Sequence, residues 1–336
     1  MSALVVVERA GTGVTAQDFG RKGFRAIGVP SGGALDASLL AAANHLAGAP
    51  EQAAGLEILL AAPTLRVERG SLRVGLAGDL AAVLAQADGS QQNVGSWRGL
   101  VLREGDTLSL RLLRGPAYIG FSGGLDLPLV LGGRSTFTRA CFGGLHGRAL
   151  VHGDILVCAE AEGETLAAPP FAHDEGPLRF IPGPQAENFP PETLEIFTTA
   201  EWRVGADRDR MGMRLSGPRL SHRRGGANIV SDGATPGAIQ VPGDGRPILL
   251  AADCQTSGGY AKIGCVIAAD LCRAAHFQPG ESIRFAAVDL DAAATARRNF
   301  REKFAQWRAK IAPAAGKWDA DKLWSENLIS GATSGD

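Results

Sequence analysis

The segment Arg103-Glu-Gly-Asp-Thr-Leu-Ser-Leu110 is the first of three segments that share one local pattern. The other two are Val151-His-Gly-Asp-Ile-Leu156 and Gln278-Pro-Gly-Glu-Ser-Ile-Arg-Phe285. In each, a glycine and an acid are followed by alternating apolar residues, which predicts a turn that leads into a half-buried strand. Because the pattern recurs without a fixed period, we expect repeated β units and neither a solenoid nor a propeller.

The composition agrees with a β-rich fold. The chain has 336 residues, enough for one large or two ordinary domains, and it contains 45 glycines and 18 prolines. These residues lie between apolar runs and predict many turns and short strands. The formal net charge is −1 and no basic stripe is present, so nucleic-acid binding is not expected.

The chain gives no sign of export or of membrane insertion. Its first residues lack a basic region and a long apolar run, and no apolar stretch has membrane-spanning length, so we expect a cytoplasmic protein. An odd number of cysteines without a C-x-x-C pair predicts buried free thiols in a reducing compartment. They are Cys141, Cys158, Cys254, Cys265 and Cys272.

The segment 161–176 lacks periodicity and separates two mostly β lobes. The predicted domains are an N-terminal lobe over 1–165, a linker over 166–177, a C-terminal lobe over 178–289, a helix over 290–312 and a mobile tail over 313–336. Apolar periodicity predicts four helices. They cover Asp36–Leu46 with Asp36 as N-cap, Glu192–Thr198, Ile267–Phe277, and Leu290–Ile311 with Asp291 as N-cap.

One segment carries an unusual density of polar groups. An apolar run over Ile248–Asp253 is followed by a predicted loop over Gln255–Lys262, which holds an amide, two hydroxyls, two glycines, a phenol and an amine. Loops at strand ends can aim such groups at a ligand, so we interpret this loop as one wall of a binding site. Lys262 could hold a carboxylate or a phosphate, or act as an acid or base. The alternative is a tight turn with a solvated lysine, and the spacing does not fit a Walker loop.

Four further segments are weaker candidates. The turn Gly28–Asp36 is either a plain helix cap or an anion site at a helix N-terminus. Arg134 could clamp a carboxylate or simply bond loop carbonyls. Gln185 stands at a strand end, and Gln240 lies within a strand that faces either a cavity or solvent.

Several kinds of chemistry are not expected. Asp209 and Arg210 stand in a tight turn, where an acid–arginine pair is more often structural. The six histidines lack metal-ligand spacing, so no metal site is expected. No nucleophile–base set is evident, and Cys254 is interpreted as a buried thiol.

These blocks, in this order, resemble the allophanate hydrolase subunit 2 family. It is also called the biotin-dependent carboxyltransferase family and includes the C subunit of 5-oxoprolinase and KipA-like proteins. The matching blocks are Gly28–Asp36, Tyr118–Thr136, Pro182–Phe189, Asp209–Leu215, Ser231–Pro242 and Asp253–Gly264. The chain departs from the family pattern at four positions: Glu187 replaces Asp, Asp232 replaces Glu, Ser257 replaces Thr and Ala261 replaces Pro.

The resemblance implies a mostly β fold of two cyclophilin-like β-barrel lobes, with a few short helices and a C-terminal helix. It implies the ATP-dependent opening of 5-oxo-L-proline to L-glutamate, with two partners: a KipI-like B subunit plus a LamB/YcsF-type A subunit. ATP would bind at or with the partner subunit. No covalent biotin is expected, because the chain has no biotin-carrier Met-Lys-Met segment. The alternatives are a carboxyltransferase acting on urea or a related amide, and a non-enzymatic regulator that binds a KipI-like kinase inhibitor.

Carried onto this chain, these expectations assign roles to particular residues. Lys262, Arg134 and Gln255 would be catalytic, with Lys262 and Arg134 stabilising developing negative charge. The substrate-binding residues would be Ser31, Gly32, Asp36, Gln185, Gln240, Thr256, Ser257, Gly258, Gly259 and Tyr260.

Overall fold

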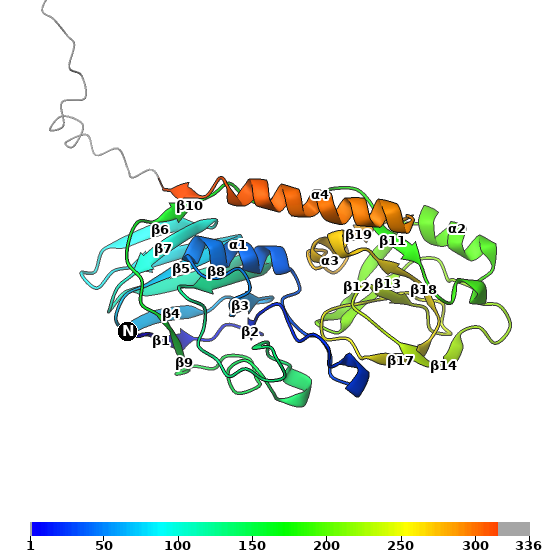
Figure 1. Cartoon of the computed structure of the whole chain (residues 1–336), viewed down its shortest axis with the longest axis horizontal. Helices are drawn as coiled ribbons and strands as arrows, with labels where there is room; N and C mark the ends of the chain where they lie inside the picture. Colours follow the sequence, from blue (N-terminus) through cyan, green and yellow to red (C-terminus); the bar gives the residue numbers. More distant parts are fainter. Residues whose placement is uncertain (1, 315–336) are drawn as a thin grey trace, which may run out of the picture.

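Two β-sheets, each with its own apolar core, form two lobes that lie side by side in the computed structural model (Figure 1). The structure describes residues 2–314. Strands dominate both lobes and the first sheet curves into a nearly closed barrel, so the predicted mostly β fold class is confirmed.

The first lobe is an eleven-stranded sheet whose main path runs β21-β10-β7-β5-β8-β4-β1-β9. Off this path, β6 pairs with β5, while β3 pairs with β2 and β8. The strands are β1 Ser2–Arg9, β2 Thr15–Gln17, β3 Gly55–Ile58, β4 Thr64–Arg69, β5 Leu72–Ala85, β6 Gln91–Gly95, β7 Arg98–Leu102, β8 Thr107–Phe121, β9 Ile155–Ala159, β10 Leu166–Ala167 and β21 Ala312–Pro313. The 3-10 helices η1 Arg25–Ile27 and η2 Thr138–Ala140 lie in its connections.

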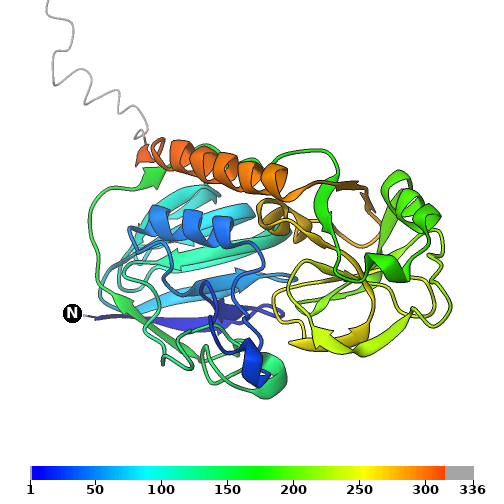
Figure 2. The same ribbon diagram turned by 45° about the vertical axis from the view of Figure 1, so that its right-hand side comes forward.

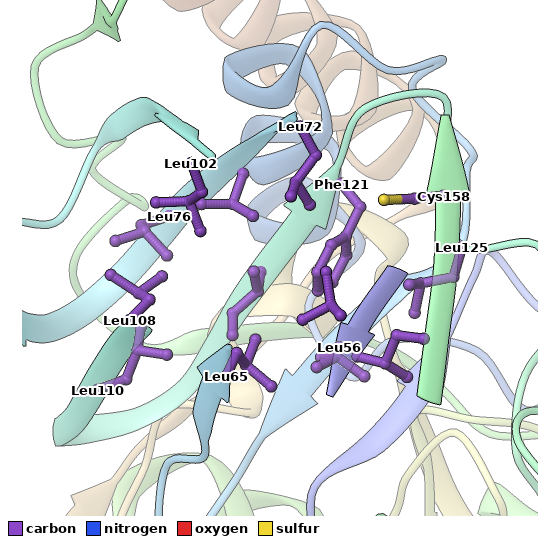
Figure 3. Packing of buried hydrophobic residues seen from close by; sticks show 14 of the residues in the cluster. Leu56, Leu65, Leu72, Leu76, Leu102, Leu108, Leu110, Phe121, Leu125 and Cys158 are labelled. Atoms are coloured by element: carbon purple, nitrogen blue, oxygen red, sulfur yellow. The ribbon is translucent and has the colours of Figure 1, made fainter. Parts of the chain in front are cut away.

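The core of this lobe follows from strand alternation. In β1 the buried residues alternate with partly exposed ones, because successive side chains of a strand point to opposite faces. Figure 3 shows Leu56, Leu72, Phe121 and Cys158 converging from different strands on the interior of the sheet.

Helix α1 Ala37–Ala47, which the apolar periodicity predicted, covers the other face of β5, β7 and β8. Asp36 is its N-cap, and the Asp36 carboxylate accepts from the backbone N–H of Ser38 at 2.9 Å. The helix lies directly on glycines of the sheet, because a Cβ at Gly75 would come within 1.9 Å of the Ala43 carbonyl oxygen. Glycine therefore sets the distance between helix and sheet.

The second lobe is an eight-stranded sheet of order β19-β12-β13-β16-β15-β18-β11-β20 and a separate two-stranded ribbon of β14 and β17. The strands are β11 Leu178–Pro182, β12 Trp202–Asp209, β13 Gly212–Ser216, β14 Asn228–Gly233, β15 Ala238–Gln240, β16 Ile248–Leu250, β17 Ser257–Tyr260, β18 Lys262–Val266, β19 Ser282–Ile283 and β20 Phe285–Ala287. Aromatic rings fill its core, where Phe197 stacks on Phe285 with ring centroids 4.6 Å apart.

The remaining predicted helices are present with small shifts at their ends. They are α2 Pro191–Thr199, α3 Ala268–Ala274 and α4 Leu290–Arg308, with the short η3 Ala186–Asn188 before α2. The N-cap of α4 is Asp289, which accepts from the N–H of Ala292 at 2.8 Å, so the predicted cap at Asp291 is wrong. Asp291 lies inside the first turn, where a carboxylate favours the helix dipole without capping it.

Helix α4 runs across both lobes and contacts α1, α3 and β11 (Figures 1 and 2). Its aromatic residues Phe304 and Trp307 pack on Phe171, which belongs to the segment that connects the lobes. No helix within residues 2–314 has both the length and the apolar character needed to cross a membrane.

The segments predicted as linker and tail contain short strands. Within the first, β10 pairs with β7, and β21 then adds to β10 at the sheet edge. The predicted mobile tail over 313–336 lies outside the described residues from 315 onward.

The three turn–strand segments share one contact, which explains their common pattern. Asp106, Asp154 and Glu281 each accept from the backbone N–H three residues earlier, at 2.8, 2.8 and 2.9 Å. The acid therefore closes the turn before β8, β9 and β19, as the sequence predicts.

Two further expectations are wrong. The segment Gln255–Lys262 is largely strand, because the ladder between β17 and β14 pairs its backbone without any apolar pattern. Among the cysteines, all of them free thiols, Cys141 is exposed. It ends η2 in a left-handed conformation with φ 53°, at the surface.

Candidate functional site

Lys262 is the centre of a polar group in the second lobe. The residue is only 4% exposed, and its amine donates to the Asp232 carboxylate at 3.0 Å. Gln185 bridges the same two residues: its Oε1 accepts from the Lys262 N–H at 3.2 Å, and its Nε2 donates to Asp232 at 3.0 Å. Three separate segments, the turn before η3, β14 and β18, thus meet at Lys262.

Two glutamines extend this group. Gln240 pairs with Lys262 in the ladder between β15 and β18, which places the two residues on adjacent strands. Gln255 Nε2 donates to Gln240 Oε1 at 3.2 Å. Gln240 Nε2 is buried and has no hydrogen-bond partner within residues 2–314.

The ribbon of β14 and β17 covers these glutamines. Asp232 pairs with Gly258 across the ribbon, and a Cβ at Gly258 would lie 2.5 Å from Gln240 Nε2. Only glycine lets the ribbon approach Gln240 so closely. Ser257 and Tyr260, on the same strand, are exposed.

The neighbours of Asp232 stabilise its negative charge. Hydrogen bonds from the Lys262 amine, the Gly233 backbone N–H and the Gln185 amide lower the pKa of the Asp232 carboxyl. The side chain of Asp232 is 51% exposed, whereas that of Lys262 is 5% exposed. An incoming anion could therefore replace the exposed partner while the ammonium stays in place.

Two predicted residues of the first lobe lie beside the turn that precedes β17. The N–H of Gly32 donates to the carbonyl of Ala252 at 3.2 Å. Arg25 connects the same regions, since it donates to Ser31 Oγ at 3.5 Å and to the Gln255 carbonyl at 3.1 Å. The carbonyl of Thr256 accepts from Ala234, which fixes the start of the ribbon.

Arg134 lies in a different part of the first lobe. Its Nε donates to the carbonyl of Leu127 at 3.0 Å, and its backbone N–H donates to Asp18 at 2.6 Å. This is the loop-carbonyl contact that the sequence left open as an alternative. Within residues 2–314, no hydrogen bond or ion pair of Arg134 reaches the Lys262 group.

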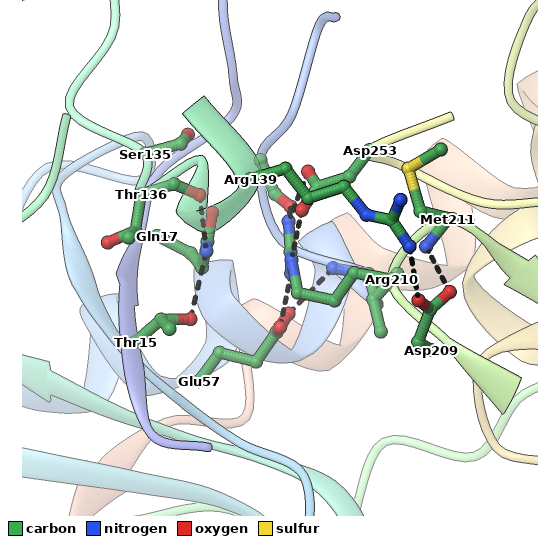
Figure 4. Close-up of polar contacts among 12 residues, drawn as sticks. Thr15, Gln17, Glu57, Ser135, Thr136, Arg139, Asp209, Arg210, Met211 and Asp253 are labelled. Carbon is green, nitrogen blue, oxygen red and sulfur yellow. Dashed lines mark hydrogen bonds and ion pairs between the residues drawn. The ribbon is translucent and has the colours of Figure 1, made fainter. Parts of the chain in front are cut away.

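A buried ion network joins the two lobes near this site (Figure 4). Arg210 donates to Asp253 at 2.8 and 3.0 Å and also to Glu57. Burial disfavours the charged guanidinium, but the carboxylates of Glu57 and Asp253 outweigh it and raise the pKa of Arg210. Arg210 therefore does not pair with its neighbour Asp209, which turns instead to Arg139.

The structure brings Gln185, Gln240, Gln255 and Gly258 together around Lys262. It places Ser31 and Gly32 beside the turn that precedes β17. Sequence reasoning gave no role to Asp232 or to Arg25. The signal for Asp232 was its place in a block that matches the family pattern, whereas nothing local marked Arg25. Cys254 is buried and burial raises the pKa of its thiol, which does not favour a thiolate nucleophile.

Comparison with known proteins defines the class. Residues 27–287 match the family model described as carboxyltransferase domain, subdomain A and B, and the chain belongs to this family. The suspected resemblance is thereby confirmed.

Two relatives match nearly end to end. The 5-oxoprolinase C subunit of Escherichia coli strain K12 is 35% identical over 313 residues, which cover 91% of this chain and 98% of that protein. The 5-oxoprolinase C subunit of Haemophilus influenzae is 34% identical over 289 residues, which cover 84% of this chain and 91% of that protein.

A solved structure supports the fold. The crystal structure of the Kluyveromyces lactis urea carboxylase superposes with a TM-score of 0.80 at 25% sequence identity. The match covers 93% of this chain and 30% of that one, so this chain spans less than a third of the larger protein.

Proposed function

We propose that this chain is the C subunit of an ATP-dependent 5-oxoprolinase, which opens 5-oxo-L-proline to L-glutamate together with A and B subunits. The observation that carries the proposal is the match to the Escherichia coli 5-oxoprolinase C subunit over 98% of that protein's length. This assignment requires two partners: a KipI-like B subunit plus a LamB/YcsF-type A subunit.

The Lys262 group suits such a substrate. 5-Oxoproline offers a carboxylate, a lactam carbonyl and a lactam N–H. The Lys262 ammonium is an electrostatic partner for the carboxylate, which would replace Asp232 beside it. The free Nε2 of Gln240 can donate to the lactam carbonyl, and the side-chain oxygens of Gln185 and Gln255 can accept from the lactam N–H.

The reaction needs activation, because a lactam is a weak electrophile. In the proposed sequence, the lactam oxygen takes the γ-phosphoryl group of ATP and ADP leaves. Water then adds to the activated carbon, and the C–N bond of the ring breaks as the nitrogen takes up a proton, which leaves an acyl phosphate. A second water hydrolyses the acyl phosphate to the carboxylate and free phosphate. ATP would bind at or with the partner subunit, and donors fixed near the lactam would stabilise the anionic intermediate.

The role of Arg134 in this scheme depends on the assembly. Its contacts with Leu127 and Asp18 hold it away from the Lys262 group. A catalytic Arg134 would therefore act at a surface shared with a partner subunit.

The proposal is tested by co-expressing the chain with its A and B subunits and measuring glutamate and ADP from 5-oxoproline. Lys262→Ala should lower kcat/KM by about 100-fold, the usual effect of removing one charge-stabilising donor. Lys303→Ala is the matched control, because Lys303 is an exposed lysine on α4 paired with Asp174. Full activity of Lys262→Ala would contradict the role of Lys262, and an assembled complex with no turnover would contradict the function.

Carboxyl transfer to urea or a related amide is the second candidate. It is favoured by the superposition on the Kluyveromyces lactis urea carboxylase over 93% of this chain. Avidin separates the two: it would block transfer from a biotin carried on another protein, whereas the opening of 5-oxoproline would continue.

A further inference from the structure

A buried carboxylate and two histidines meet at the junction of the lobes. Asp36 Oδ2 lies 2.7 Å from His173 Nε2 and 2.7 Å from His276 Nε2. Asp36 is 0% exposed and caps α1 of the first lobe, His173 belongs to the connecting segment, and His276 follows α3 of the second lobe. Their ligand atoms all lie within 4.8 Å of one another.

The two carboxylate oxygens of Asp36 have different partners. Oδ1 accepts from the backbone N–H groups of Ser38 and Leu39, so it is occupied by the helix cap. Oδ2 faces only the two imidazoles. The cap fixes the direction of Oδ2, since a carboxylate held at one oxygen cannot rotate freely.

Aromatic packing fixes the imidazoles as well. The ring of His173 stacks on Phe300 of α4 at 6.3 Å and meets Phe171 edge-on at 5.4 Å. The two histidine rings lie 5.1 Å apart. His173 is therefore held by aromatic packing, and both rings present Nε2 to Asp36 Oδ2.

An apolar cavity of about 270 Å³ lies between the lobes near this group. Its wall includes Leu35, Ala37 and Ala275, which adjoin Asp36 and His276 in the chain.

From this arrangement we propose that Asp36, His173 and His276 bind a divalent transition-metal ion, of which Zn²⁺ fits best. One carboxylate and two imidazoles form a three-ligand set typical of zinc sites that keep a fourth position for water, and imidazole ligands disfavour Mg²⁺ and Ca²⁺. The ion would neutralise the negative charge of the buried carboxylate. With metal–ligand bonds of about 2.0–2.3 Å, the two nitrogens need to move outward by roughly half an ångström.

The metal would cross-link the two lobes. Its ligands come from the first lobe, the connecting segment and the second lobe, so binding would stabilise their relative orientation. This inference is independent of the proposed function. Sequence spacing gives no sign of the site, because Asp36 is 137 positions from His173 and 240 positions from His276.

The test uses the full chain, stripped with a chelator and then titrated with Zn²⁺ by calorimetry and by thermal unfolding. We expect one zinc per chain and a Tm increase of about 5 °C at a hundredfold excess over Kd. Replacement by Co²⁺ should give the visible bands of a tetrahedral site, and His173→Gln should weaken these bands.

His173→Gln and His276→Gln are the informative variants, because glutamine can still donate to Asp36 but is a poor zinc ligand. Each should weaken zinc binding by at least about tenfold, in proportion to the lost ligand. His222→Gln is the matched control, since His222 contacts the carbonyl of Val241 and the ring of Phe189 in the second lobe, and its replacement should leave binding unchanged. The proposal is overturned if the native chain takes up no zinc, or if both variants bind zinc as the native chain does, which would mark adventitious surface binding.

Discussion

The ion network around Arg210 gives a prediction that can be worked from the structure. The change is Arg210→Met, which keeps most of the side-chain volume and removes the guanidinium. It leaves Glu57 and Asp253, which are 0% and 3% exposed, without their shared cation. Because these carboxylates belong to different lobes, the loss falls on the junction between them.

The expected loss is large. The guanidinium makes two hydrogen bonds to Asp253, one to Glu57 and one to the Gly33 carbonyl. Glu57 would still accept hydrogen bonds from the Tyr118 hydroxyl and the Leu35 N–H. Most of the free-energy cost of a buried, unpaired carboxylate would therefore fall on Asp253. Removing one partner of a buried ion pair costs about 3–5 kcal/mol, and we expect about 4 kcal/mol here.

The assay is guanidinium chloride unfolding, followed by tryptophan fluorescence and by circular dichroism so that separate unfolding of the lobes is seen. Arg214→Met is the control, because the Arg214–Asp244 pair is exposed and should be worth less than about 1 kcal/mol. The double variant Glu57→Gln with Arg210→Met should lose less than the sum of the single losses, since the two residues are coupled. A loss below about 1 kcal/mol for Arg210→Met would refute the reasoning.

Two other predictions concern the ribbon and a surface turn. Gly258→Ala should raise the KM for 5-oxoproline about tenfold, because its Cβ would lie 2.5 Å from Gln240 Nε2. The control Gly243→Ala, whose Cβ would have its nearest neighbour at 3.9 Å, should change KM little, and equal KM values for the two variants would argue against this site. Asp154→Asn should cost about 1–2 kcal/mol at pH 7, because the two-pronged hydrogen bond from Arg148 lowers the pKa of the Asp154 carboxyl. A carboxyl whose pKa is lowered by folding contributes its full stability above the unfolded pKa of about 4 and loses it as pH falls below that value. In urea unfolding from pH 7 to pH 3, the difference in free energy of unfolding between native and variant chains should therefore shrink. A constant difference would disprove the assignment.

The sequence predicted much of the local structure. The turns before β8, β9 and β19 were predictable because glycine, acid and alternating apolar residues act within a few positions. Helix α1 was found for the same reason, with its cap at Asp36. The ribbon strand β17 was missed because glycine and serine have low strand preference, and only pairing with β14 makes this segment extended.

The candidate site was only partly predictable. The glutamines and Lys262 stand at the ends of recognisable strands, so their grouping could be expected. Asp232 and Arg25 could not be assigned, because each acts on a residue that is 30 or 230 positions away. Arg134 was a candidate because it is polar and follows a glycine pair. Its Nε instead donates to a carbonyl of its own loop, that of Leu127.

The sequence by itself determined most of the elements, the two β lobes and the family, because short-range patterns of apolar residues, turns and motif blocks occur in order along the chain. Tertiary structure alone decided which charges meet. Arg210 turns away from Asp209 toward Glu57 and Asp253, and Asp36 receives two histidines from distant segments. The physical reason is that a buried charge requires a partner wherever the fold supplies one, and sequence distance has no part in that requirement.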